Sequence, residues 1–119
     1  MIIRADVADT INKAKDEGHK IVMVGTTTTK ALESSVYANG HVKTTQMNGK
    51  EDAWTNKFIY PPYRFMVGDA MITNFHASQS SMLMMVAAFG GYEFVMRAYK
   101  EAVAEKYRFL TYGDAMLII

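Results

Sequence analysis

A short hydrophobic run that leads through a glycine into a helix is the feature that most restricts the fold of this chain. Residues 20–24, Lys-Ile-Val-Met-Val, are rich in β-branched side chains, and Gly25 and four threonines separate them from a helix-like segment at 30–37. Ahead of the run, residues 6–17 carry apolar side chains at helical spacing and end at Gly18. A strand this apolar is typical of a parallel sheet buried on both faces. Helix, strand, glycine turn and helix together predict an α/β layer with a partly parallel sheet and flanking helices.

The rest of the chain is expected to extend that layer. We predict three further strands and two further helices: strands at 41–47, 57–60 and 70–73, and helices at 82–89 and 93–106. Ser78 or Ser80 caps the first of these helices, which is apolar all round and is therefore expected to be buried. Asn48-Gly49 is a strong turn signal, Pro61-Pro62 ends the strand before it, and an apolar tail at 116–119 closes the chain.

Charge and composition exclude several classes of function. The 119 residues suit one domain, and 13 Lys and Arg against 12 Asp and Glu give a net charge of +1, which excludes a strongly basic nucleic-acid module but not a local basic patch. The absence of Cys excludes disulfides, thiolate metal sites and a Cys nucleophile. His19, His41 and His76 lack metal-ligand spacing, so no metal is expected. The longest apolar run, 82–89, is too short to span a bilayer, and we expect a soluble, cytoplasmic chain.

Two segments at predicted strand ends carry polar groups suited to binding or catalysis. The residues from Gly25 to Lys30 turn from strand to helix, where backbone N–H groups converge and can hold a phosphate or carboxylate; the alternative is an ordinary capped helix start. His76 follows the strand at 70–73, and ligands of α/β sheets bind at the carboxyl ends of strands. It either moves a proton near neutral pH or makes a structural hydrogen bond.

Other candidates are open to two interpretations. Four aromatic residues flank two prolines and a cation: Phe58, Tyr60, Tyr63, Phe65 and Arg64. Such a group either stacks nucleobases or fills a core. Asp69 and Asp114 each lie beside an apolar segment. Each acts as a base, accepts a hydrogen bond from a ribose hydroxyl, or only caps the segment. The methionines at 82, 84 and 85 favour core packing.

Several motifs in a fixed order resemble one known family. These are Val24-Gly25-Thr26-Thr27, Ala31-Leu32-Glu33, Phe58-Ile59-Tyr60-Pro61, Tyr63-Arg64-Phe65, Asp69, Ile72-Thr73-Asn74-Phe75-His76, Leu83-Met84, Ala88-Phe89, Tyr107-Arg108-Phe109 and Tyr112-Gly113-Asp114-Ala115-Met116-Leu117. Together they resemble the carboxyl-terminal part of the S-adenosylmethionine:tRNA ribosyltransferase-isomerases of queuosine biosynthesis, over nearly the whole chain.

The resemblance implies an enzyme that uses S-adenosylmethionine as a substrate and has no cofactor. Members of the family transfer the ribosyl part of S-adenosylmethionine to a 7-aminomethyl-7-deazaguanine base in tRNA and isomerise it, which gives epoxyqueuosine and releases adenine and methionine. Such a site must deprotonate an amine and the carbon beside the sulfonium, protonate the departing adenine, and offer flat walls to the bases.

Matching positions are the candidates for these roles. Proton transfer is assigned first to His76, with Asp69 or Asp114 as second choices. Substrate binding is assigned to the remaining matches: Thr26, Thr27 and Thr28 for an anion, Lys30 beside them, Tyr60, Tyr63 and Phe75 for stacking, Arg64 and Arg108 for phosphate or carboxylate, and Asn74.

The chain also departs from the family pattern. Ala77-Ser78-Gln79-Ser80-Ser81 replaces Leu-Pro-Lys-Ser-Thr, Lys30 and Tyr92 each replace an Arg, and Pro62 replaces a Gly. These changes lead us to expect altered anion binding and motivate an alternative, a diverged non-catalytic paralogue that binds a nucleotide or RNA.

The resemblance further implies a longer parent protein. We expect residues 1–119 to be the carboxyl-terminal segment of the α/β domain of a two-domain enzyme whose β-barrel is absent here. Alone, the segment is expected to be inactive and, with uncovered apolar surface, to self-associate.

Overall fold

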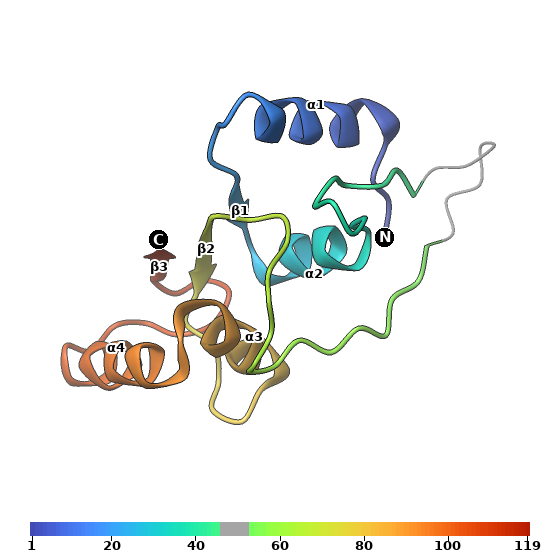
Figure 1. Cartoon of the computed structure of the whole chain (residues 1–119). Coiled ribbons are helices and arrows are strands. Elements are labelled where there is room, and N and C mark those ends of the chain that lie inside the picture. The colour runs from blue at the N-terminus through green and yellow to red at the C-terminus, as the bar shows by residue number, and fades with distance from the viewer. Residues whose placement is uncertain (46–52) are drawn as a thin grey trace.

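The computed structural model describes residues 1–45 and 53–119 and confirms the α/β class (Figure 1). Its elements, in chain order, are α1 (Ala5–Asp16), β1 (Val22–Val24), α2 (Thr26–Ser34), β2 (Ala70–Asn74), α3 (Ser81–Gly90), α4 (Tyr92–Ala104) and β3 (Ala115–Ile118). The molecule is elongated, 49 × 30 × 26 Å, with α1 and α4 at opposite ends and the sheet between them.

The three strands form one mixed sheet in the order β1-β2-β3. β1 and β2 are parallel, with Val22 opposite Ala70, and β2 and β3 are antiparallel, with Asn74 opposite Ala115. The partly parallel sheet is therefore confirmed. The apolar tail at the end of the chain, which carried no assignment of its own, supplies β3.

One face of the sheet is buried and much of the other is exposed, which contradicts the expectation for residues 20–24. Met23 is buried, whereas Val24 on the other face is 62% exposed and Leu117, which faces the same way, is 60% exposed. α2 packs on β1 and α3 packs on α2, and among the described residues no helix covers the opposite side. We call this exposed surface, formed by Val22, Val24 and Leu117, the outer sheet face.

Most helix predictions are confirmed, with shifted ends. α1 matches the predicted range and is followed by Gly18 at a φ of +78°, a conformation that glycine adopts without strain. α2 begins at Thr26 rather than Lys30, because Gly25 is its N-cap. Ser80 is the cap of α3, since its Oγ accepts a hydrogen bond from the backbone N–H of Leu83 at 3.1 Å.

Three features of the predicted structure are wrong. α3 is not buried all round, because it is a surface helix whose Met82 and Met84 are exposed. Residues 57–60 form no strand and pair with none of the described strands. The Ile59 side chain is buried and holds the segment against the core. Of the predicted strand at 41–47, only Val42 pairs, in an isolated bridge with Val36. Residues 46 and 47 and the predicted Asn48-Gly49 turn lie outside the described residues.

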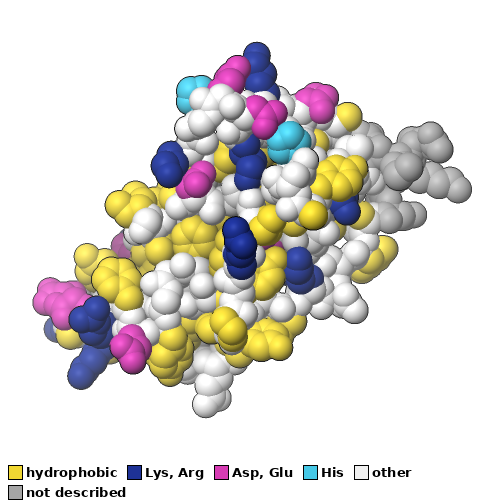
Figure 2. Space-filling model, viewed as in Figure 1, with side chains coloured by type: hydrophobic (Ala, Val, Ile, Leu, Met, Phe, Trp, Pro, Cys, Tyr) yellow, Lys and Arg dark blue, Asp and Glu magenta, His cyan; other side chains and the backbone are white. Residues whose placement is uncertain are grey.

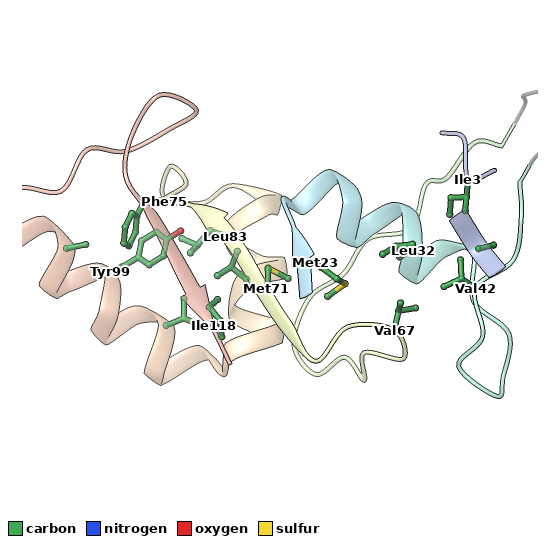
Figure 3. Packing of buried hydrophobic residues seen from close by; sticks show 14 residues of the cluster. Ile3, Met23, Leu32, Val42, Val67, Met71, Phe75, Leu83, Tyr99 and Ile118 are labelled. Atoms are coloured by element: carbon green, nitrogen blue, oxygen red, sulfur yellow. The ribbon is translucent and has the colours of Figure 1, made fainter. Parts of the chain in front are cut away.

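The core is a continuous row of buried side chains along the molecule (Figure 3). At one end Ile3 and Val42 pack beneath α1, in the middle Met23 and Met71 join the sheet to α2, and at the other end Phe75, Tyr99 and Ile118 pack against α4. This row fixes the sheet against α2, and so fixes the carboxyl ends of β1 and β2.

Candidate functional site

A cleft of about 340 Å³ opens at the carboxyl ends of β1 and β2. Three stretches of chain line it: Val24–Thr27, Ile72–Asn74 with His76, and Leu110, Thr111 and Ala115 from the carboxyl-terminal loop, with Met82 of α3 at its edge. The sequence predicted a site at this sheet edge, and the structure brings Thr26, Thr27, Asn74 and His76 together there.

One wall of the cleft is the first turn of α2. Gly25 adopts a φ of +90° and its N–H donates to the carbonyl of Ile72 at 2.8 Å, which joins the turn to β2. Thr29 is fully buried, and its Oγ1 and N–H both donate to the carbonyl of Gly25. Thr29 is thus a structural residue of the turn, and the N–H groups of Thr26 and Thr27, in the first turn, have no intrahelical acceptor. Those two N–H groups and the helix dipole favour an anion.

Thr28 and Lys30 lie beside this wall rather than in the cleft. Thr28 lines a separate, mostly apolar cavity of about 670 Å³ under the amino-terminal segment. Lys30 and Lys57 line a smaller cleft of about 180 Å³, which shares Thr26 and Thr27 with the larger one. The two clefts therefore meet at the start of α2, with cations on one side.

His76 forms the second wall and is held at two points. Its Nε2 lies 2.7 Å from Oγ1 of Thr73, and its backbone N–H donates to the hydroxyl oxygen of Tyr99 at 2.9 Å. Thr73 and His76 are 4% and 9% exposed, respectively. Burial lowers the pKa of His76 below its ordinary value of 6.5, because the charged imidazolium is poorly solvated there. A neutral ring in a fixed orientation therefore borders the cleft at neutral pH.

The predicted aromatic residues divide into two groups. Phe75 is a core residue, 4% exposed and packed edge-on against Tyr99 and Tyr107, so it offers no stacking surface. Tyr63 donates its hydroxyl hydrogen to Glu33, and burial raises its pKa. Tyr60 is half exposed beside the equally exposed Phe58, with ring centroids 5.4 Å apart. Of the predicted stacking residues, Tyr60 is the most exposed.

The two aspartates are engaged in structural roles, and neither lines the cleft. Asp69 precedes β2, at the opposite end of that strand from His76, and its Oδ2 accepts from the backbone N–H of Ile21 at 2.8 Å. Asp114 closes the carboxyl-terminal loop, where its Oδ2 accepts from the backbone N–H of Arg108 at 2.7 Å.

The three remaining candidates differ in where they lie relative to the cleft. The Arg108 guanidinium is exposed and lies 3.7 Å from the Asp114 carboxylate. Asn74 donates its side-chain amide to the carbonyls of Gly113 and Asp114, which holds the carboxyl-terminal loop against β2. Arg64 is exposed, away from the residues that line the two clefts.

Glu33 belongs to one of the family motifs, but the sequence analysis gave it no role. It is fully buried, and its carboxylate accepts from the backbone N–H groups of Met66 and Val67 and from the hydroxyl of Tyr63, at 2.9–3.2 Å. Its backbone carbonyl accepts from Nζ of Lys57 at 2.7 Å. Glu33 therefore anchors the segment that carries Tyr60. Its position directly after Leu32, on the buried side of a helix, was the sequence feature that could have indicated this role.

Charge on the visible surface is mixed, as the net charge of +1 predicts. Figure 2 shows cationic and anionic side chains intermixed at both ends of one face, with hydrophobic side chains between them. Within residues 1–45 and 53–119, no group of three or more His, Asp or Glu side chains is arranged to hold a metal ion. None of the helices in this part of the chain has the length and apolar character needed to cross a bilayer.

Comparisons with known proteins agree on one family. The sequence model described as "Queuosine biosynthesis protein" matches residues 1–118. The S-adenosylmethionine:tRNA ribosyltransferase-isomerase of Parabacteroides distasonis is 54% identical over all 119 residues, and that of Thermoanaerobacter sp. is 48% identical over 118. These matches cover 32% and 33% of the two relatives, so the chain spans about a third of their length. The crystal structure of the Thermotoga maritima S-adenosylmethionine tRNA ribosyltransferase superposes with a TM-score of 0.82 at 40% identity, over 98% of this chain and 39% of that one.

Proposed function

The chain belongs to the queuosine biosynthesis protein family, and from that membership we propose that it forms part of a cytoplasmic S-adenosylmethionine:tRNA ribosyltransferase-isomerase. The reaction is the one that the resemblance implies: transfer and isomerisation of the ribosyl group onto 7-aminomethyl-7-deazaguanine in tRNA. The observation that carries the proposal is the cleft, where Thr26, Thr27 and His76 from distant segments meet. The rest of the catalytic unit is supplied by polypeptide equivalent to the other two-thirds of the relatives' length.

The cleft and the chain beside it offer groups for anion binding, for contact with the departing adenine and for base stacking. The N–H groups of Thr26 and Thr27 bind a carboxylate or phosphate, and Lys30 adds charge from the adjoining cleft. His76 donates a hydrogen bond to the departing adenine, since its ring is buried, oriented and neutral at pH 7. Tyr60 offers a ring face to a base extruded from the tRNA.

Most of the departures from the family pattern lie away from this cleft. Ser78, Gln79 and Tyr92 line a separate groove of about 460 Å³ together with Pro61. Lys30 keeps its positive charge in the adjoining cleft. The replaced residues thus leave the walls around His76 intact, which favours an enzyme over a non-catalytic paralogue.

A hybrid enzyme tests the proposal. The matching third of the Parabacteroides distasonis relative is replaced by this chain, and adenine release and ribosyl transfer are measured with S-adenosylmethionine and deazaguanine-bearing tRNA. We expect the hybrid to turn over, His76→Ala to abolish turnover, and His19→Ala to leave it unchanged, since His19 is an exposed residue near the amino end of β1. A folded hybrid that binds both substrates but releases no adenine would support the paralogue instead.

A further inference from the structure

Thr73 lies beside the proposed catalytic histidine, and nothing in the chemistry above gives it a role. Its Oγ1 is buried and has one hydrogen-bond partner among the described residues, Nε2 of His76 at 2.7 Å. The backbone N–H of His76 donates to the hydroxyl oxygen of Tyr99, which packs on Phe75, and the His76 side chain is buried, which leaves its ring little room to turn. The pair is therefore a fixed contact between a hydroxyl and one ring nitrogen.

The direction of that hydrogen bond follows from which groups need a partner. A buried O–H without an acceptor is unfavourable, whereas an oxygen lone pair without a donor matters less. Since the Thr73 hydroxyl has no other acceptor in the described structure, its hydrogen points at Nε2. Nε2 then accepts, and the hydrogen of the neutral ring resides on Nδ1.

Nδ1 is the other nitrogen of the His76 ring. It has no hydrogen-bond partner in the part of the protein that the structure describes. Among the described residues, every buried side-chain nitrogen or oxygen has such a partner, so Nδ1 is not a buried atom. Nδ1 therefore contacts solvent, and His76 lines the cleft beside the carboxyl end of β2.

We propose that Thr73 is a positioning residue that selects the Nδ1–H tautomer of His76, so that the ring presents a hydrogen-bond donor to the cleft. The ligand atom facing it is an acceptor, such as a nitrogen of the departing purine or an oxygen of a carboxylate. The tautomer stands on geometry alone. The use of the donor on a purine rests on the proposed function.

Nitrogen-15 NMR of the histidine side chains in the 119-residue chain reads the tautomer directly. At a pH where His76 is neutral, we expect Nδ1 to resonate as a protonated nitrogen and Nε2 as an unprotonated one. Thr73→Val should abolish this preference and Thr73→Ser should restore it, while His19 and His41 serve as unchanged internal references. A wild-type spectrum with the hydrogen on Nε2 overturns the proposal, even if Thr73→Val fails to fold.

Turnover of the hybrid enzyme then separates the two proposals. If His76 acts on the leaving group, Thr73→Val should lower kcat roughly tenfold or more, with little change in the KM for S-adenosylmethionine, and Thr73→Ser should recover most of it. If the tautomer is as proposed but His76→Ala turns over normally, the catalytic assignment fails and the positioning by Thr73 stands. If Thr73→Ser restores the fold but neither the tautomer nor kcat, the positioning role is overturned.

Discussion

Replacing Glu33 by Gln should destabilise the fold through one specific loss. The two carboxylate oxygens accept from the N–H groups of Met66 and Val67 and from the Tyr63 hydroxyl. A Gln side chain keeps one acceptor oxygen and points an NH₂ group at donors, so at least one bond is lost. Hydrogen bonds to a charged group contribute about 1.5–3 kcal/mol each, and an unmatched buried donor adds to the loss. We expect the free energy of unfolding to fall by about 2–4 kcal/mol and Tm by about 10 °C.

Urea denaturation measures that loss, and hydrogen exchange locates it. Relative to the wild type, Glu33→Gln should accelerate the exchange of the Met66 and Val67 amides more than it accelerates the exchange of amides in α4. The matched control is Glu101→Gln, on the exposed side of α4, which should change stability by less than about 0.5 kcal/mol. A loss below about 1 kcal/mol for Glu33→Gln, with unchanged exchange at residues 66 and 67, would refute the anchoring role.

Three further outcomes are expected. Burial lowers the pKa of His76 below 6.5, so below that pH the unfolded chain binds a proton more readily than the folded chain does. The contribution of the neutral ring to the free energy of unfolding is therefore complete above pH 6.5 and is lost as the pH falls toward the folded-state pKa. His76→Asn should therefore flatten the decline of unfolding free energy below pH 6.5, and equal slopes in urea titrations would contradict this. Ser80→Ala should cost about 1 kcal/mol in thermal unfolding because the α3 cap is lost, whereas Ser78→Ala should have little effect; equal losses would rule out Ser80 as the cap. In sedimentation velocity the isolated chain should self-associate through the outer sheet face, and Val24→Ser with Leu117→Ser should shift it toward monomer; a monodisperse wild-type monomer would exclude this.

The helices, strand and helix cap that depend on neighbouring residues in the sequence were predicted from local patterns. α1, α4, β2 and the Ser80 cap follow from apolar spacing and from residues at the helix ends, and these are confirmed. The burial of β1 was mispredicted for a reason that a single strand cannot reveal: apolar residues such as Val24 indicate that a surface is to be covered, not what covers it.

The candidate site was predictable in position but not in its partners. The carboxyl ends of the strands and the glycine turn located Thr26 and His76 correctly in one cleft. The role of Glu33 depends on amides more than thirty residues away, which residue type and spacing could not supply. Asp69, in contrast, directly precedes the predicted strand at 70–73, so its place at the amino end of β2 follows from the sequence.

The pairing of β1 with β2 also has a consequence for the order of folding. Ile21 and Asp69, which meet where this pair begins, lie 48 positions apart, so closing the pair requires an entropically unfavourable long-range contact. The cleft needs this pairing as well as the loop that ends at Ala115, which lies far along the chain from Thr26. During synthesis the helices can form as they emerge, but the cleft can be completed only after Ala115 has left the ribosome.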